Sequence, residues 1–373
     1  MQKILIVSPE YPPIRGGVSD HTKNLRNALE PFVEEVKVLT SAGLGIGETD
    51  IVAPVISNWH SYQEMVCAVE NFGKNWTILW QYVPHMYGRY GVNFTIPRIV
   101  KELNRRGYVQ AMIAHEIAAS FALRPSFMLS SICHRLQWAS IVGCFRAIGV
   151  STEAWLLRFS NSLGRSERTF LCPSPSNIRK FCLSQTTRAA WCKKLGLDPL
   201  KPIVGSFGLS ADSYQVTALN RVGELLEEKQ LPVSILCVGG KSDLLRSDVQ
   251  QVGFLSEKEV SVYLQNLDVL ILPFVDGVSE RRTSFMAGLS HGCPLVTTVG
   301  ESTGASLRSL DAIETVDSNS PEMIAETVHQ LLLNPKRRES VSHKCFQAYR
   351  SQFDWKVVAE RILMEIVNSD ASN

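Results

Sequence analysis

Short apolar runs rich in β-branched residues alternate with amphipathic stretches along the whole chain, and this alternation limits the possible folds more than any other feature. The runs form two sets: "KILIVSP", "EVKVLT", "WTILWQYV", "AMIAHE", "AIGVST" and "TFLCPSP", then "PIVGSFG", "PVSILCVGG", "DVLILPF", "PLVTTV" and "AIETVD". Near-continuous apolar strands separated by helices are typical of a parallel sheet covered on both faces. The sequence therefore predicts an α/β protein with two doubly wound, Rossmann-like domains.

The connection between the two sets is predicted within 172–202, because "PSPSN" cannot continue a sheet. We expect an N-terminal domain over 1–177, a connection over 178–201 and a C-terminal domain over 202–350. A final helix over 355–367 has an apolar face that could pack on either domain; its members are Trp355, Val358, Ile362, Leu363 and Ile366. Two facing sheets of this kind predict a deep cleft, with ligands outside the carboxyl ends of the strands.

Composition argues against several classes of function. The 373 residues carry 38 Lys and Arg against 36 Asp and Glu, a balance that disfavours a nucleic-acid partner. The nine cysteines form no C-x-x-C pair and show no metal-ligand spacing, and we expect most of them to be small buried groups in a reducing cytoplasm. No apolar run approaches the ~20 residues that span a bilayer. We expect a cytoplasmic protein, for which any membrane contact would be peripheral.

Paired glycines, Gly16 and Gly17, follow the first apolar strand at the turn into a helix from about Ser19. Glycines at such a turn let a ligand approach the backbone and leave helix amides directed at it. The alternative is a turn that needs glycine for a positive φ. No G-x-G-x-x-G pattern follows a strand, which disfavours a nicotinamide dehydrogenase.

Other candidates also stand at predicted strand ends. His115 and Glu116 close "AMIAHE" and are expected to open into the cleft, although a lone histidine is equally often a structural hydrogen-bonding group. Gly239 and Gly240 follow one strand, and "QQVGF", with Val252 and Phe254, supplies another strand end. Such edges can hold a flat heteroaromatic ring or can be tight turns.

Two adjacent arginines, Arg281 and Arg282, precede a helix that is predicted to start at about Thr283. Helix N-termini favour anions, so a docked diphosphate would explain the pair, with Thr283 and Ser284 as further donors. The alternative is one solvated arginine and one that pairs with a nearby carboxylate, either Asp276 or Glu280. His291 is expected near the end of the same helix, where a cation suits the C-terminus.

The ordered succession "GGVSDHTKNLRNAL", a histidine closing a mid-domain strand, "VSTEAW", "PSPSNI", "GFLSEKEVSVYLQNLDVLILPF" and "MAGLSHGCPLVTT" resembles the family-4 retaining glycosyltransferases. The likeness covers nearly the whole chain and implies the twin-Rossmann GT-B fold of glycogen synthase-like enzymes. It implies a nucleotide-sugar donor in the C-terminal domain, an acceptor in the N-terminal domain, retention of configuration and no metal. It also places Gly16 and Gly17 beside the donor phosphates, His115 near the transferred sugar, and the last helix on the first domain.

The sequence departs from the family pattern at three positions. Two family glutamates, one for the sugar hydroxyls and one for the ribose, are replaced by Ser279 and Ala287, with Glu280 a candidate substitute one residue out of register. The family's phosphate-binding lysine has no clear counterpart, and Tyr214 or a neighbour stands in its place. Arg281 and Arg282 could supply the missing positive charge to a leaving UDP or GDP.

Three further residues are candidates for the acceptor side. Asp20 is a candidate for the cleft, and the loop "QYVPHMYGRYGVNF" offers Tyr87 and Arg89 to stack on sugar rings or to pack as a lid. A basic patch for anionic lipid, or a solvated helix face, is formed by Arg98, Lys101, Arg105 and Arg106.

The function predicted from these features is transfer of a sugar from a UDP- or GDP-sugar to a glycan or glycolipid acceptor. Two alternatives stay open. One is a catalytically weak glycosyltransferase-like protein that binds a nucleotide sugar or a partner enzyme, and the other is a nucleotide-sugar epimerase of the same fold.

Overall fold

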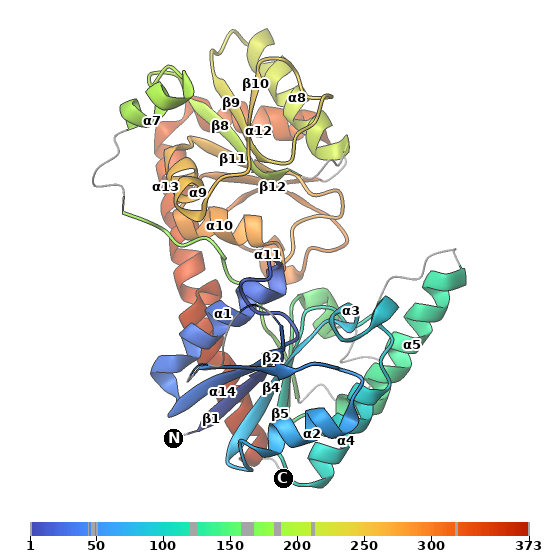
Figure 1. Ribbon diagram of the computed structural model, residues 1–373. Helices are drawn as coiled ribbons and strands as arrows, with labels where there is room; N and C mark the ends of the chain where they lie inside the picture. Colours follow the sequence, from blue (N-terminus) through green and yellow to red (C-terminus); the bar gives the residue numbers. More distant parts are fainter. Residues whose placement is uncertain are drawn as a thin grey trace. The chain divides into compact units, whose positions relative to one another are not determined.

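The computed structural model describes residues 2–43, 45, 49, 51–118, 125–157, 168–182, 188–209, 213–317 and 320–371. The chain divides into two compact units, one formed by Met1–Pro173 with Trp355–Asn373 and the other by Ser174–Asp354. Each unit contains its own parallel sheet (Figure 1), which confirms the fold class expected from the apolar runs. The division falls at Pro173 and Asp354, where the sequence placed it at 177 and 350.

The first unit is built on a seven-stranded parallel sheet with the order β3-β2-β1-β4-β5-β6-β7. Its strands are β1 (Lys3–Val7), β2 (Glu35–Ser41), β3 (Val52–Ile56), β4 (Trp76–Tyr82), β5 (Gln110–Ala114), β6 (Ala147–Val150) and β7 (Thr169–Leu171). The edge strand β3 was not among the apolar runs quoted above. It contains Pro54, which an edge strand tolerates because one side of its backbone needs no ladder hydrogen bond.

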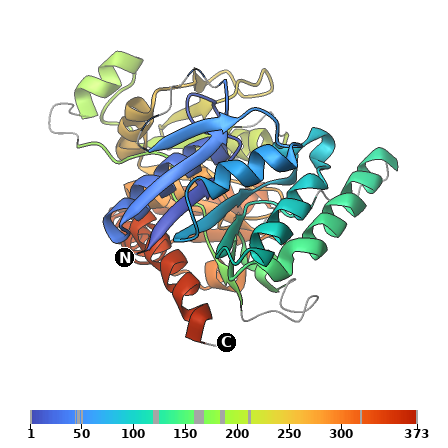
Figure 2. The ribbon, with the colours of Figure 1, turned by 60° about the horizontal axis from the view of Figure 1, so that its bottom comes forward.

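The helices of the first unit cover both faces of this sheet (Figures 1 and 2). They are α1 (Gly17–Leu29), α2 (Tyr62–Glu70), α3 (Pro84–Tyr87), α4 (Thr95–Arg105), α5 (Pro125–Ile141) and α14 (Trp355–Ala371), with short 3₁₀ turns at Glu30–Phe32, Arg89–Gly91 and Val142–Cys144. Alternate residues of β1 point to opposite faces, so Ile4 packs in the cluster of α1 and α14 and Leu5 in that of α2, α4 and α5.

The last helix, α14, belongs to the first unit. Val358, Ala359, Ile362 and Ile366 are buried in one cluster with residues of β1 and α1, and the Arg361 guanidinium donates to the Leu171 carbonyl at 3.2 Å. The amphipathic face predicted from the sequence therefore packs on α1 and β6.

The second unit has a six-stranded parallel sheet with the order β10-β9-β8-β11-β12-β13. The strands are β8 (Ile203–Leu209), β9 (Ser234–Gly239), β10 (Val249–Gly253), β11 (Val269–Leu272), β12 (Leu295–Val299) and β13 (Glu314–Asp317). Its helices are α7 (Arg188–Leu195), α8 (Ser213–Glu228), α9 (Glu257–Asn266), α10 (Thr283–His291), α11 (Ala305–Arg308), α12 (Pro321–Leu333) and α13 (Pro335–Ala348), followed by a π turn at Tyr349–Phe353. One continuous apolar core fills this unit.

Local sequence explains where these helices begin. Ser256 and Glu259 form a capping box at the start of α9, and Ser320 caps α12, which begins with Pro321.

None of the described helices is long and apolar enough to cross a membrane.

Candidate functional site

Both sheets reverse their strand order at one point, and some of the candidate residues follow the strands on either side of it. In the first unit the reversal falls between β1 and β4, and in the second between β8 and β11. Ligands of open α/β sheets bind outside the carboxyl ends of the strands at such a switch point. Each unit therefore has its own candidate binding region at the carboxyl edge of its sheet.

In the first unit, α1 begins at Gly17 with Gly16 as its N-cap residue. Gly16 has φ 173°, an extended conformation, and Gly17 is not among the residues with positive φ. The turn therefore does not need glycine for a left-handed backbone, which corrects that alternative. A Cβ at Gly16 would lie 3.1 Å from a Glu10 carboxylate oxygen, and one at Gly17 would meet nothing within 4 Å. The backbone at Gly17 is open to a ligand.

His115 is held by Gln81, the next-to-last residue of the neighbouring strand β4. The His115 Nε2 atom lies 2.6 Å from Gln81 Oε1, so the ring donates from Nε2 and its Nδ1 is left as an acceptor. Desolvation lowers the His115 pKa to about 4, so the ring is neutral near pH 7. The site thus presents an uncharged imidazole of one defined tautomer.

A second histidine, His21 on α1, packs against this pair. Its ring meets that of His115 edge to face with centroids 4.5 Å apart and lies 5.0 Å from the Trp355 ring. Neither ring nitrogen of His21 has a hydrogen-bond partner within the described part of the chain, nor does Gln81 Nε2. Burial first, and then repulsion from the His115 ring when both rings are protonated, keep the His21 pKa well below its usual value.

The remaining candidate site residues of this unit differ in solvent exposure. Glu116, Asp20 and Arg89 are exposed, and the Arg89 guanidinium stacks over the Tyr90 ring at 5.1 Å. Tyr87 is instead buried in the core, where its hydroxyl donates to the Gln81 carbonyl at 2.7 Å. Its burial corrects the predicted acceptor role, because a ring inside the core cannot stack on a sugar.

In the second unit the start of α10 is open. No described side chain caps this helix, and its N-cap residue is Arg282. Thr283 is exposed and Ser284 is partly exposed. Gly208, near the end of β8, has φ 78°, and a Cβ there would lie 3.4 Å from Ser284 Cβ. Glycine at this position lets strand β8 approach the first turn of α10 and keeps the approach clear.

The two arginines differ in their surroundings. Arg282 donates to Asp276 at 2.5 Å and lies over the Phe274 ring at 4.7 Å. Asp276 also accepts from the Ser302 hydroxyl at 2.9 Å, which links the loops after β11 and β12. Arg281 is exposed and forms no ion pair with any described residue. This is the arrangement given above as the alternative, with one arginine paired and the other solvated.

The positions of the family glutamates lie inside the unit. Ser279 is 1% exposed, and its hydroxyl has no partner within the described residues. Ala287 is fully buried in α10. Glu280 is also fully buried, where it accepts from the Ser306 hydroxyl at 3.3 Å while its carbonyl accepts from the Ser174 amide. These contacts are structural, so the placement does not support Glu280 as the substitute for a sugar-binding glutamate.

The strand ends that could hold a flat heteroaromatic ring differ in how exposed their side chains are. Gly239 has φ 127° at the end of β9, and Gly253 has φ 80° at the end of β10. Val252 is partly buried, whereas Phe254 is 90% exposed. Part of the segment where the family lysine is missing, residues 210–212, lies outside the described residues, and Tyr214 follows it in the first turn of α8.

His291 is not the cation expected at the end of α10. It is 4% exposed, its Nδ1 lies 2.8 Å from the Ala287 carbonyl, and its Nε2 lies 3.0 Å from the Ser261 hydroxyl. Desolvation lowers its pKa to about 4, so the ring is neutral near pH 7.

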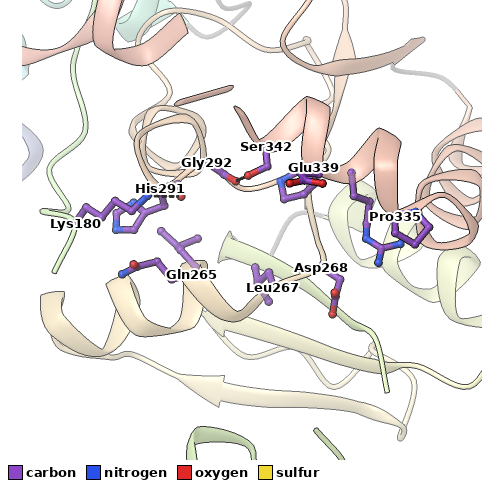
Figure 3. Close-up of a pocket in the computed structure, with 12 residues that line it drawn as sticks. Lys180, Gln265, Leu267, Asp268, His291, Gly292, Pro335, Glu339 and Ser342 are labelled. Carbon is purple, nitrogen blue, oxygen red and sulfur yellow. Dashed lines mark hydrogen bonds between the residues drawn. The ribbon is translucent and has the colours of Figure 1, made fainter. Parts of the chain in front are cut away.

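A cavity of about 400 Å³ lies beside His291, at the amino ends of β11 and β12. Figure 3 shows Lys180, Gln265 and His291 at one end of it and Asp268 and Pro335 at the other. The Lys180 ammonium donates to the His291 carbonyl at 3.0 Å. Because α/β sheets bind their ligands at the opposite, carboxyl edge, this cavity is distinct from the candidate binding region at the start of α10.

Two residues of these candidate regions were not singled out from the sequence. Gln81 and Gly208 both stand near the ends of predicted strands, and this position was the available signal. No group of three or more metal-binding side chains is found among the described residues.

Comparison with known proteins places the fold. No protein-family model matches the chain, and no curated protein matches it in sequence. Sucrose-phosphate synthase from Thermosynechococcus elongatus is 13% identical over 100% of both chains, with a TM-score of 0.67. A glycosyltransferase from Rickettsia africae is 12% identical over 100% of this chain and 99% of its own, with a TM-score of 0.71. Anabaena HepE, solved with UDP and glucose, is 13% identical over 99% of this chain and 100% of its own, with a TM-score of 0.67. At these identities the likeness shows the fold, which is GT-B.

Proposed function

We propose that this protein is a glycosyltransferase that takes its sugar from a nucleotide diphosphate sugar. The observation that carries the proposal is the open first turn of α10 at the switch point of the second sheet. The first-turn amides, the hydroxyls of Thr283 and Ser284, and the exposed guanidinium of Arg281, which forms no ion pair with a described residue, all belong to this helix start. That combination of donors suits the two phosphates of a leaving nucleotide.

Charge explains why these groups would accelerate transfer. As the glycosidic bond breaks, negative charge builds on the diphosphate, and donors fixed in advance stabilise it more in the transition state than in the ground state. Arg281 needs no rearrangement of an existing ion pair to take part. Arg282 would contribute by holding the loop through Asp276, so we assign the direct contact to Arg281.

His115 is proposed to bind the transferred sugar. Its Nδ1 forms no hydrogen bond with a described residue, so it can accept one from a sugar hydroxyl while Gln81 fixes Nε2 as the donor. A neutral ring is required for that role, which agrees with a pKa of about 4. We name no general base, because substitution in which the donor phosphate receives the acceptor proton needs none from the protein.

The finer features of the proposal rest on the family resemblance. They are a UDP- or GDP-sugar, retention of configuration, independence from metal, and a glycan or glycolipid acceptor. The UDP and glucose complex of the HepE structure supports the donor class. A protein cation at α10 would balance the diphosphate in place of a metal. We further propose a cytoplasmic location with peripheral contact to the inner face of a membrane, supported by the basic residues of α4.

The test is a thermal-shift screen against UDP, GDP and their sugars, followed by product analysis with the donor that stabilises best. A ligand at 100 times its dissociation constant stabilises the native state by about 2.7 kcal/mol, which moves the melting temperature measurably. We expect a nucleoside diphosphate to do so and the matching nucleoside to have little effect. Equal shifts from nucleoside and diphosphate would contradict the assignment of phosphates to α10.

A second candidate is a nucleotide-sugar-binding protein with weak or no transferase activity. The burial of Ser279, Glu280 and Ala287 favours it, because no carboxylate stands at either glutamate position to hold the sugar or ribose. Donor binding without hydrolysis or transfer, over a panel of sugar acceptors, would establish this candidate. Free nucleoside diphosphate with an inverted sugar would instead indicate an epimerase.

A further inference from the structure

The helix α5 buries polar side chains beside the apolar Trp138 and Ile141, and it exposes a group of apolar ones. Its inward side chains include Ser131, His134 and Gln137, all of which are at most 3% exposed. Four apolar side chains instead point to solvent, Met128 at 49%, Leu129 at 63%, Ile132 at 42% and Leu136 at 58% exposed. At 100° per residue these four fall within about one third of the helix circumference. They form one outward stripe, which we call the α5 stripe.

The inward polar residues have a structural reason. Gln137 donates to the Gly91 carbonyl at 3.0 Å and accepts from the Asn93 amide at 2.5 Å, while the His134 ring bonds the Tyr90 carbonyl at 2.8 Å. They satisfy the backbone of the turn at Arg89–Gly91. The stripe has no such role within the first unit. A monomer that exposes a continuous apolar patch of this kind usually uses it for an interaction.

The segment of the chain that contains the stripe is rich in basic residues. Residues 84–151 contain eight Lys and Arg and two Glu, in a protein whose net charge is only +2, and no Asp or Glu occurs between Glu116 and Glu153. The neighbouring helix α4 lies beside α5 in the same layer (Figures 1 and 2). Its exposed side chains include Phe94, at its N-terminus, with Arg98 and Lys101.

The ion pairs of α4 refine the basic patch expected from the sequence. Arg105 and Arg106 both donate to Glu102, and Arg106 also pairs with Glu70. Arg98 and Lys101 form no ion pair with a described residue, so their charges are available to a partner. Two free cations thus accompany the apolar stripe.

We propose that the α5 stripe and the exposed face of α4 together form a docking surface for an anionic lipid bilayer. Apolar side chains enter the boundary between headgroups and acyl chains while cations contact anionic headgroups, which is the combination that interfacial helices use. A second copy of this chain fits less well, because a two-fold contact would bring the same cationic surfaces together. The proposal deepens the membrane contact included in the proposed function, and it is independent of the sugar chemistry.

The test is co-sedimentation of the full chain with vesicles of equal parts phosphatidylglycerol and phosphatidylcholine, compared with pure phosphatidylcholine vesicles. We expect binding to the first only, weakened by salt because the charge contribution is screened. Changing Arg98→Gln with Lys101→Gln should weaken binding roughly 30-fold, at about a factor of five per cation. Changing Leu129→Gln with Leu136→Gln should weaken it at least about tenfold.

Matched controls lie on the second unit. Leu333 is 58% exposed, like Leu136, and Leu200 is 91% exposed, so Leu200→Gln with Leu333→Gln removes at least as much exposed apolar surface elsewhere. Lys193→Gln with Lys258→Gln removes two exposed cations. Both controls should bind like the wild type, and circular dichroism should show all variants folded.

Two results would overturn the proposal. The first is absence of wild-type binding to anionic vesicles, or equal loss in the control variants. The second is a concentration-dependent dimer that the Leu129→Gln, Leu136→Gln pair abolishes, which would assign the stripe to self-association. No donor or acceptor is present in these measurements, so failure here leaves the nucleotide-sugar proposal to its own test.

Discussion

At the scale of single residues, the contact between Gln81 and His115 sets the state of the imidazole. The pKa of His115 lies at about 4 because desolvation opposes the charged form, and the neutral Gln81 does nothing to offset it. Changing Gln81→Glu places a carboxylate at the same 2.6 Å contact. We expect the His115 pKa to rise by roughly one to three pH units, because an adjacent anion favours the imidazolium.

The measurement is a titration of the histidine rings by ¹⁵N nuclear magnetic resonance. His291 provides an internal control, since it belongs to the second unit and its pKa should stay at about 4. An unchanged His115 titration in the Gln81→Glu variant would show that Gln81 does not govern this ring. The same titration reports the tautomer, which we expect to be protonated at Nε2.

His291 makes a second prediction, about acid stability. Its folded pKa of about 4 lies below the ~6.5 of an unfolded histidine, so the unfolded chain binds more protons between these values. Stability therefore falls as pH decreases through this window, by about 2 kcal/mol between pH 7 and pH 5 from this group. Urea unfolding at the two pH values measures the loss.

The variant His291→Gln removes the titrating group and should reduce this acid sensitivity. His343→Gln, an exposed histidine of the same unit, is the matched control and should keep the wild-type slope. If both variants lose stability on acidification as the wild type does, other groups dominate the acid response.

At the scale of elements, substitutions of the two arginines before α10 should have different effects, one on the affinity for a nucleoside diphosphate and the other on the stability of the fold. Arg281 is exposed and unpaired among the described residues, so Arg281→Ala should weaken nucleoside diphosphate binding roughly tenfold to a hundredfold without changing the melting temperature. Arg282 ties the loop through Asp276 and Phe274, so Arg282→Ala should cost about 1–2 kcal/mol of stability. Calorimetric titration and thermal melting measure the two effects.

Arg350→Ala, at an exposed arginine of the turn Tyr349–Phe353, is the control for both measurements. Equal loss of affinity in the Arg281→Ala and Arg350→Ala variants would show that α10 does not bind the diphosphate. A strongly destabilised Arg281→Ala variant would mean that this residue has a structural contact.

Helices and strands with a clear hydrophobic periodicity were predicted well from the sequence, whereas the surroundings of individual side chains were not. The start of α10 at Thr283 and the strands on either side of it follow from a buried run, a polar loop and a second buried run. Tyr87 and Glu280 are buried by segments that are distant in the sequence. The local sequence pattern around each residue therefore does not predict its burial. The burial of polar side chains on α5 is not predicted for the same reason, since these residues serve the backbone of a turn more than 40 positions earlier.

At the scale of the whole molecule, the first unit is discontinuous in sequence. The chain leaves it at Pro173, completes the second unit, and returns to it at Trp355. The amphipathic pattern of the last helix does not predict which unit the helix packs on, because an apolar surface of either unit could bury its apolar face. Only the packing of Val358, Ile362 and Ile366 against α1 and β1 decides it.

This arrangement predicts that a destabilising substitution in α14 also destabilises α1, which lies near the start of the chain. Ile362 is 1% exposed in the cluster with α1, so Ile362→Ala should destabilise the first unit by about 2–5 kcal/mol through the lost contacts and the cavity left behind. Hydrogen exchange should then accelerate at the amides of α1 and β6, since local openings follow cooperative units. The amides of α8 and β9, which belong to the second unit, should keep their wild-type rates.

Met364 lies on the same helix and is 53% exposed, so Met364→Ala is the matched control and should leave exchange unchanged. If Ile362→Ala accelerates exchange in both units equally, the two units unfold as one cooperative body and the division at Pro173 and Asp354 has no energetic meaning. If it affects only the last helix itself, α14 is an appendage that contributes little to the first core. Faster exchange confined to α1, β6 and α14 is the result that this packing requires.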